Sequence, residues 1–469
     1  MKAWCNIGVC TGLHTSSFLH MQDIKKIFIA NTAEAFADLL EQIAAKADQK
    51  DKIQQELDLS QRAQLWGTDN KVIITPNPIP TALLKCNAER IGYKNIKNLW
   101  PKNSDIRICK SILNDPVLIK TIIQIFQSNQ GVKVSSYAIT DDYINLLRFL
   151  EEKATGWQTT NLPKTKNPLG LVKAIDSKNG FRKIVASLGL QENLKLPSGF
   201  ICHTEADTAK AIRRFFDIGK GFVIKVHNGE SGWGVKIIDN DTVQKLARNK
   251  INDWLRELFE SDPIWDFAPY VVEEFISVNK TIGGGFPSGE GHITDDGFIF
   301  DYNCGQEVTK EGSFEGVVLS NDIIPNFVDS SMRIGTNMIG NELYSKGYRG
   351  VFDIDFAAGQ DGNLYILESN ARMTGGTHVY NIMSYLSISG NNAYVISNDS
   401  FRYNMPPQKP EEILTRLSDI LYPIEYQKRG IVISFISLNR PVIGMIVIGQ
   451  NKKDAHSLIR RAKDCLTEN

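Results

Sequence analysis

The chain has 469 residues, which is too long for one ordinary hydrophobic core, so two or three domains are expected. Hydrophobic residues make up 42% and charged residues 23%, as is typical of soluble globular proteins. The formal net charge is zero, which argues against nucleic acid as the main partner, because binding its backbone depends on surplus Lys and Arg.

The seven cysteines are scattered, and none forms a Cys-x-x-Cys pair. This pattern predicts neither a disulfide framework nor a zinc site, and it favours a reducing cytoplasm. Cys5 and Cys10, with His14 and His20 beyond them, could bind a metal, but no second Cys pair completes a site. No apolar run approaches the roughly 20 residues of a membrane span, and polar residues come too early for a signal peptide.

The first 155 residues alternate between strand-like and helix-like segments. Strands are predicted at 26–31, 71–75 and 133–137, and helices at 33–46, 113–126 and 142–153. This alternation predicts a parallel α/β layer. The polar residues 156–168, which include two prolines, follow as a predicted linker.

Beyond the linker, the pattern changes to hairpins. A helix is predicted at 177–189, and strands at 222–226, 234–238, 270–276, 350–358 and 364–368. The last two strands are joined by Gln360-Asp361-Gly362-Asn363, a turn sequence that predicts an antiparallel pair. After Pro406 and Pro407, a small α+β lobe is predicted from a helix at 410–420, strands at 430–437 and 442–449, and a helix at 454–466.

A glycine-rich loop follows a strand that ends in a lysine, in the order Lys225, Gly229, Ser231, Gly232 and Gly234. Glycines let backbone N–H groups approach an anion, and the lysine adds a positive charge, so the segment is interpreted as a phosphate cradle. It is neither a Walker A loop nor a Rossmann fingerprint, because both need a helix after the loop. The alternative is a hairpin with flexible glycines.

A second motif is the strand-like segment that ends in Glu273, Glu274, Phe275 and Ile276. The end of such a strand can present backbone groups to an adenine edge and a carboxylate to the adenine amine. The alternative is an ordinary strand with two exposed acids.

The third motif combines Asp353 and Asp355 on one strand with Glu-x-Asn-x-Arg on the next. The alternation of a strand points Glu368, Asn370 and Arg372 to one face. With Asp355 on the neighbouring strand, two carboxylates and an amide oxygen form an all-oxygen site suited to magnesium. Arg372 adds a permanent cation that can grip a phosphate or acyl-phosphate oxygen. The alternative is a surface hairpin with solvated charges.

The residues after Arg372 are small or carry hydrogen-bond donors: Met373, Thr374, Gly375, Gly376, Thr377 and His378. Gly375, Gly376, Thr377 and His378 are candidate substrate contacts. A histidine near a glycine turn, such as His378 or His227, has the plainer alternative of a hydrogen-bonding residue.

In this order, the motifs resemble those of the ATP-grasp superfamily. The likeness covers residues 177–380, from SKNGFRKIVASLGL through GESGWGV and VVEEFI to VFDIDF and GNLYILESNAR. Within the superfamily, the chain looks most like peptide ligases of the pheganomycin type. The segments LNDPVLIKTI and VSSYAIT resemble the first domain of those ligases, and KRGIVISF and GMIVIG resemble their last.

The resemblance implies roles for individual residues. Lys178 and Lys225 would contact ATP phosphates under the glycine loop, and residues 273–276 would line the adenine pocket. Asp355, Glu368 and Asn370 would hold two magnesium ions, with manganese as an alternative. Lys225 and Arg372 would be catalytic, with Arg372 steadying the acyl phosphate.

The resemblance also implies an α/β (α+β) fold in three parts. These are a pre-ATP-grasp α/β domain at 1–155, an ATP-grasp domain at 169–405 and an α+β lobe at 406–469. The nucleotide would lie between two antiparallel-sheet subdomains, with a lid at about 178–270. A homodimer is the expectation by analogy.

Two positions depart from the family pattern. Asn279 and Lys280 stand where many relatives place an acid for the ribose hydroxyls. Asp353 stands where many ligases have a basic residue, so it is predicted to bind an amine substrate or to add to the metal site.

The predicted activity joins a small carboxylate, such as an amino acid or peptide, to an amine through an acyl phosphate, with release of ADP and phosphate. Three rivals remain open. One is an ATP-grasp kinase, another is an ATP-binding regulatory module without turnover, and the third is a ligase that acts on a protein.

Overall fold

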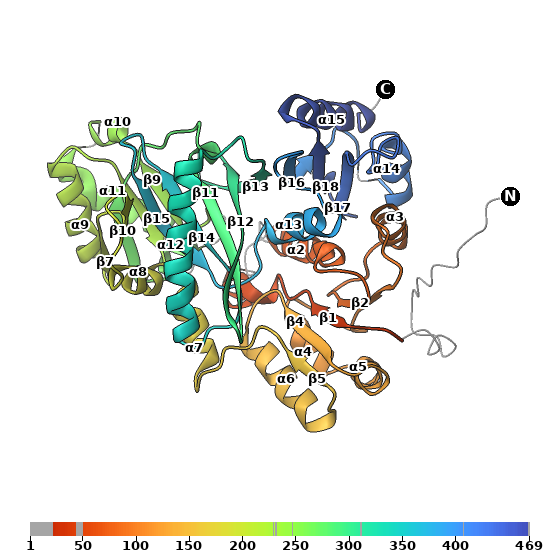
Figure 1. The fold of residues 1–469 in the computed structure, drawn as a ribbon. Coiled ribbons are helices and arrows are strands. Elements are labelled where there is room, and N and C mark those ends of the chain that lie inside the picture. The colour runs from red at the N-terminus through yellow and green to blue at the C-terminus, as the bar shows by residue number, and fades with distance from the viewer. Residues whose placement is uncertain are drawn as a thin grey trace. The chain divides into compact units, whose positions relative to one another are not determined.

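The computed structural model describes residues 22–43, 50–227, 229, 232–245, 247–309, 312–406 and 408–467. The suggested metal position at Cys5 and Cys10 lies outside these residues. The chain forms two compact units, one made of Met1–Leu162 with Gly375–Asn469 and the other of Pro163–Thr374. Figure 1 shows both units in colours that follow the chain.

The first unit contains the parallel α/β layer that the sequence predicts. Its five strands run in the order β3-β2-β1-β4-β5, and every pair is parallel. The strands are β1 (Lys26–Ile29), β2 (Lys71–Ile74), β3 (Ile96–Leu99), β4 (Val132–Ser136) and β5 (Trp157–Thr159). The central strands are largely apolar and buried, as expected of a parallel sheet covered on both faces.

Helices connect these strands, and one prediction needs correction. The helices are α1 (Ala37–Ile43), α2 (Lys50–Leu59), α3 (Thr81–Ile91), α4 (Ile108–Leu113), α5 (Pro116–Ser128) and α6 (Asp141–Lys153), with 3-10 turns η2 (Glu34–Phe36) and η4 (Ser60–Leu65). The helix predicted at 113–126 is wrong at its start, because α4 ends at Leu113 and α5 begins at Pro116. Asp115 caps α5, accepting from the backbone N–H groups of Val117 and Leu118, and Pro116 occupies the first helical position.

The same unit includes the C-terminal part of the chain. Its elements are α13 (Thr377–Tyr385), β16 (Tyr394–Arg402), α14 (Pro410–Arg416), β17 (Gly430–Ile436), β18 (Val442–Gly449) and α15 (Lys452–Cys465). Antiparallel pairing places β18 between β17 and β16. Side-chain amides also pair with β17, since Gln61 exchanges two hydrogen bonds with the backbone of Ile436, and Asn87 donates to Ile433 O at 2.8 Å. These amides cover an edge that would otherwise expose unpaired backbone groups.

The second unit begins with two helices, α7 (Pro168–Asp176) and α8 (Lys178–Ala186), followed by a small antiparallel sheet. The sheet has the order β7-β10-β8-β9. Its strands are β7 (Gly199–Cys202), β8 (Phe222–Val226), β9 (Val235–Ile238) and β10 (Tyr270–Glu274). Three helices accompany it, namely α9 (Glu205–Asp217), α10 (Asn240–Val243) and α11 (Ile251–Ser261).

A larger sheet completes the second unit, with strands in the order β13-β12-β11-β14-β15-β6. They are β6 (Leu194–Lys195), β11 (Pro287–Thr294), β12 (Gly297–Val308), β13 (Phe314–Leu319), β14 (Gly350–Ala358) and β15 (Leu364–Asn370). Helix α12 (Asn326–Ser345) packs on β11 and β12, close to Phe298, whose ring lies 2.5 Å from the position of a Cβ at Gly340. This close approach leaves no room for a larger residue at that point of the helix.

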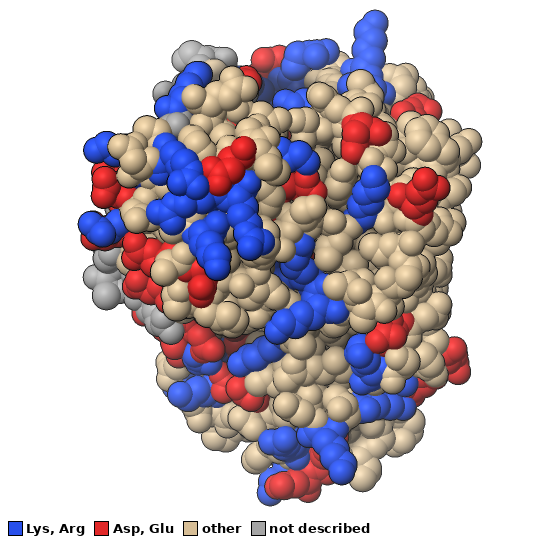
Figure 2. Space-filling model, turned by 90° about the vertical axis from the view of Figure 1, so that its left-hand side faces the viewer, with Lys and Arg blue, Asp and Glu red and all other residues tan. Residues whose placement is uncertain are grey.

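The outer face of the small sheet's helices carries both kinds of charge, and Figure 2 shows a group of Lys and Arg bordered by Asp and Glu. Helix α9 alone contributes Lys210, Arg213, Arg214, Glu205, Asp207 and Asp217. Arg248 pairs with Asp217 at 2.7 Å, and both side chains are exposed. Mixed charges of this kind are typical of a solvated surface. Within the described residues, no helix is long and apolar enough to cross a membrane.

Candidate active site

The core of the candidate site is the antiparallel pair β14 and β15. Its register places Asp355 beside Glu368 and Asp353 beside Asn370. These side chains share one face of the sheet, because residues two apart on a strand point the same way. The structure therefore brings together the acids and the amide that the third sequence motif singled out.

The pKa values of the two carboxylates proposed for metal binding are shifted in opposite directions. Burial, and then the neighbouring charge of Glu368, raises the pKa of Asp355 to about 6. Burial also opposes ionisation of Glu368, but Lys178 and Lys225 outweigh it and hold the pKa of that carboxyl below its usual value. Lys178 and Lys225 therefore stabilise the charge of Glu368, whereas the charge of Asp355 is disfavoured by burial and by Glu368. A divalent cation beside Asp355 would stabilise its ionised form.

Arg372 lies just beyond β15 and is oriented by two contacts. Its Nη1 donates to Asn370 Oδ1 at 2.5 Å and lies 3.4 Å from Asp176 Oδ1. Asp176, at the end of α7, also accepts from the backbone N–H of Ala371 at 2.9 Å. The last turn of α7 thereby fixes the segment that carries Arg372.

Lys178 opens α8 and reaches both the acids and the glycine loop. Ser177 caps the helix by accepting from Gly180 N, which places Lys178 in the first turn. Lys178 Nζ lies 3.2 Å from Glu368 Oε2 and donates to Gly229 O at 3.0 Å. The predicted phosphate lysine and the predicted loop therefore meet beside the acidic pair.

The glycine loop joins β8 and β9, which are antiparallel neighbours as predicted. Gly232 and Gly234 have φ angles of 84° and 75°, a conformation that favours glycine. A Cβ at Gly234 would lie 2.3 Å from Val226 Cγ2. Ser231, also predicted to bind the nucleotide, lies outside the described residues.

Lys225 is the second-last residue of β8, and its side chain forms an ion pair with Glu273 of β10. Glu273 is 4% exposed, and its second oxygen lies 3.3 Å from Arg182 Nη1. Burial alone would lower the pKa of Lys225, but Glu273 and Glu368 overcome it and raise the pKa above its ordinary value. Glu273 thus keeps Lys225 charged, and its two oxygens are engaged by Lys225 and Arg182.

The neighbouring residues of the predicted adenine segment are also held. Glu274 accepts from Ser198 N at 2.8 Å and lies 3.1 Å from Lys220 Nζ. Strand β10 ends there, and Phe275 and Ile276 follow it as half-buried residues. Both carboxylates are engaged, and the backbone N–H of Phe275 donates to Gly221 O at 2.9 Å. An adenine contact would therefore use the remaining backbone groups of this segment. That role remains a prediction.

The segment after Arg372 is divided between the two units. Thr374 closes the second unit, and Gly375 opens the remaining part of the first. Gly376 precedes α13, which begins with Thr377 and His378. The side chain of His378 is wholly buried, with Nε2 3.9 Å from Asp399 Oδ1, and burial lowers its pKa well below the ordinary value. The substrate contacts predicted for residues 375–378 remain predictions.

Several residues near the acids were not found from the sequence. Gln306 on β12 donates its amide N–H to Asp355 Oδ1, and Glu290 on β11 accepts from the hydroxyl of Thr374 at 2.6 Å. Arg182 joins Glu273, as described above. Gln306 and Glu290 lie outside the quoted motifs, and Arg182 lies within SKNGFRKIVASLGL without a predicted role. Only the pairing of distant strands and helices reveals these contacts.

The oxygen atoms present fit magnesium better than a transition metal. Within the described part of the chain, no three His, Cys, Asp or Glu side chains converge as a metal site. Asp355, Glu368 and Asn370 instead offer two carboxylates and one amide oxygen. Magnesium is commonly held by one or two carboxylates together with substrate phosphates and water, so this smaller donor set suits it.

No family model matches the chain. A segment of 221 residues is 26% identical to L-propargylglycine–L-glutamate ligase of Streptantibioticus cattleyicolor, and the match covers 43% of this chain and 42% of that protein. The chain therefore matches less than half the length of this curated relative.

Two solved structures share the fold over most of the chain. Biotin carboxylase from Campylobacter jejuni, solved as a β,γ-ATP complex, has a TM-score of 0.55 at 11% identity and covers 95% of this chain and 92% of its own. N5-carboxyaminoimidazole synthase from Aspergillus clavatus, solved with ADP and 5-aminoimidazole ribonucleotide, has a TM-score of 0.50 at 10% identity, covering 95% and 99%. At these identities the likeness establishes the fold alone. The chain has the fold that the resemblance to the ATP-grasp superfamily predicts.

Proposed function

We propose that the protein is an ATP-dependent ligase that joins a carboxylate to an amine and releases ADP and phosphate. The observation that carries the proposal is the shared sheet face of Asp355, Glu368 and Asn370, with Arg372 beyond it and Lys178 beside it. Acids and cations placed this closely are suited to hold a metal-bound triphosphate.

The reaction has two steps. The γ-phosphoryl group of ATP passes to a carboxylate oxygen, which gives an acyl phosphate and ADP. The nitrogen of the amine then attacks the acyl carbon and loses a proton, an amide bond forms, and phosphate leaves. When bound by Asp355, Glu368 and Asn370, magnesium would neutralise charge that develops on the phosphate oxygens.

The side chains would contribute mainly position and charge. Lys178 and Lys225 would contact the phosphates, and Glu273 keeps Lys225 protonated and fixed. Arg372 would grip the acyl phosphate, because its guanidinium is permanently charged and already oriented by Asn370 and Asp176. The glycine loop would cover the phosphates and exclude water, which would otherwise hydrolyse the acyl phosphate.

Amino acids or small peptides are the proposed substrates. The curated relative supports this choice, because its name gives two amino acids as the molecules that it joins.

The test measures nucleotide products with Mg²⁺ and ATP, using pools of amino acids and other small carboxylic acids with and without amines. We expect ADP and phosphate only when an acid and an amine are both present. Glu368→Gln and Lys225→Ala should abolish ADP formation. Glu342→Gln should not, because Glu342 lies on α12 in a partly exposed ion pair with Lys346.

Other products would exclude the proposal. AMP and pyrophosphate would indicate adenylation instead of an acyl phosphate. ADP together with a phosphorylated alcohol, in the absence of any amine, would indicate a kinase. Normal turnover in Glu368→Gln would remove that residue from the catalytic site.

A further inference from the structure

A second row of polar side chains lies beside the proposed metal ligands in the large sheet. Glu290 on β11 is in register with Asp353 on β14, and Asp353 is in register with Asn370 on β15. The neighbouring row contains Asp355 and Glu368. Both rows share one face of the sheet, because positions two apart on a strand point the same way.

Asp353 and Glu290 of this second row accept hydrogen bonds from residues on either side of Arg372, in the segment from Asn370 to Thr374. Asp353 Oδ1 accepts from the backbone N–H of Asn370 at 3.0 Å and from its Nδ2 at 2.8 Å. Glu290 Oε2 accepts from the hydroxyl of Thr374 at 2.6 Å. Asp353 is 6% and Glu290 3% exposed, so the donors they need must come largely from the protein.

These bonds decide which way the amide of Asn370 faces. Its Nδ2 donates to Asp353 and lies 3.3 Å from Asp355 Oδ2, whereas its Oδ1 accepts from Arg372 Nη1 at 2.5 Å. If the amide were flipped, its oxygen would face two carboxyl groups and its NH₂ group would face a guanidinium. Both contacts would lack a donor–acceptor match, so one orientation is strongly preferred.

We propose that Asp353 is a positioning residue, which holds the amide of Asn370 so that Oδ1 accepts from Arg372 and Nδ2 faces the carboxyl groups of Asp353 and Asp355. Glu290 acts in the same way on the following residues through Thr374. In this role Asp353 is neither a metal ligand nor a contact for the amine. The inference rests on the proposed function, since it assigns Asn370 to the metal site.

The experiment compares Asp353→Asn with Asp353→Ala. The side-chain oxygen that remains in Asp353→Asn can still accept from Asn370. Asp353→Ala removes the acceptor of the backbone N–H of Asn370 and leaves Nδ2 with the 3.3 Å contact to Asp355. We measure ATP affinity by calorimetry as a function of Mg²⁺ concentration, which requires no turnover. We also measure the KM for the amine and confirm folding by thermal unfolding.

We expect Asp353→Ala to weaken magnesium-dependent ATP binding by about 10–100-fold, as removal of a residue that orients a metal ligand usually does. Asp353→Asn should restore nearly all of this affinity, and the KM for the amine should not change in either variant. If Asp353→Ala does not fold, Asp353→Asn alone decides, because positioning needs only an acceptor oxygen, whereas ligation or ammonium binding is weakened by loss of the charge.

Two results would overturn the inference. Loss of magnesium-dependent binding in Asp353→Asn would make Asp353 a metal ligand, and a raised KM for the amine in that variant would make it a substrate contact. The ligase proposal fails separately, if the wild-type protein binds ATP with magnesium but forms no amide. The binding comparison would then still test the positioning role.

Discussion

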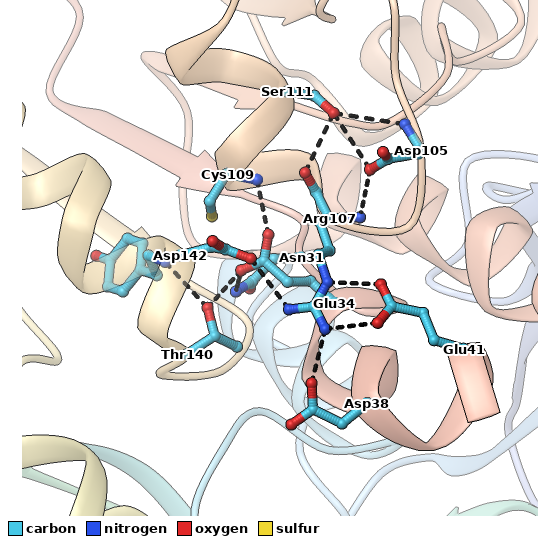
Figure 3. A network of polar contacts seen from close by, with 11 residues as sticks. Asn31, Glu34, Asp38, Glu41, Asp105, Arg107, Cys109, Ser111, Thr140 and Asp142 are labelled. Carbon is cyan, nitrogen blue, oxygen red and sulfur yellow. Dashed lines mark hydrogen bonds and ion pairs between the residues drawn. The ribbon is translucent and has the colours of Figure 1, made fainter.

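Two charged residues of the first unit differ sharply in their surroundings, although Figure 3 shows them in one polar network. Arg107 lies near the surface and pairs with Asp38 and Glu41, both at 2.6 Å. Glu34 is 3% exposed and accepts from Cys109 N at 2.7 Å and from Asn31 Nδ2 at 3.1 Å. Burial raises the pKa of Glu34, and hydrogen bonds only partly offset this effect.

Replacing these acids should therefore have different effects on stability. Glu34→Ala should lower the free energy of unfolding by about 2–4 kcal/mol, because it removes the acceptor of the buried Cys109 N–H and one of the two acceptors of Asn31 Nδ2. Glu41→Ala should cost less than about 1 kcal/mol, as expected for an exposed ion pair. Denaturant unfolding of both variants checks the difference, and equal losses would show that burial does not set the cost.

At the scale of elements, the loop between β8 and β9 depends on glycine for two reasons. Gly234 has a φ of 75°, and a Cβ there would lie 2.3 Å from Val226 and 3.0 Å from Ile264. Gly219, at the end of α9, has a φ of 67° but no heavy atom within 4 Å of a Cβ position. These two glycines separate the effect of backbone conformation from the effect of a clash.

We expect Gly234→Ala to weaken ATP binding at least tenfold, because the loop must move away from Val226 and Ile264 to accept the methyl group. Gly219→Ala should leave ATP affinity unchanged and cost about 1–2 kcal/mol of stability. Calorimetric titration with ATP and Mg²⁺ measures both effects. Unchanged affinity in Gly234→Ala would show that the loop does not cover the phosphates.

Helix α13 contains a buried base, His378, whose pKa lies well below its ordinary value of 6.5. As the pH falls below 6.5, the unfolded chain takes up a proton that the buried ring does not. The contribution of neutral His378 to the free energy of unfolding is therefore fully present above pH 6.5. It decreases as the pH falls below that value, by at most about 1.4 kcal/mol per pH unit.

His378→Gln should make unfolding less sensitive to pH between 7.5 and 5.5, whatever its effect on absolute stability. His456→Gln is the control, because His456 is a partly exposed residue of the same unit. The midpoint of thermal unfolding, followed across this pH range, gives the slope for each variant. A slope in His378→Gln equal to that of the wild type would contradict the assignment.

At the scale of the whole molecule, the residues proposed to bind ATP and magnesium all belong to the unit of Pro163–Thr374. A ligand that binds only the folded state stabilises it by about 2.7 kcal/mol at a hundredfold excess over its Kd. ATP with Mg²⁺ should therefore raise the unfolding midpoint of this unit. Chelation by EDTA should remove most of the shift, and an equal shift without any divalent ion would exclude the metal site.

The local features of this protein could be predicted from its amino-acid sequence. The alternation of Glu-x-Asn-x-Arg placed three side chains on one face, and the turn at Gln360–Asn363 predicted the pairing of β14 with β15. Even the start of α5 could have been found, because Asp115 and Pro116 are ordinary signals for the beginning of a helix. Such features depend on residues close together in the chain.

The tertiary structure alone decided the contacts between distant segments. Glu273 meets Arg182 across 91 positions, and Gln306 meets Asp355 across 49. It also showed that Asp353 bonds to Asn370 and that His378 is buried. Sequence periodicity states which face a side chain occupies, but only strand register and helix packing determine its partner, and the partner determines its chemistry.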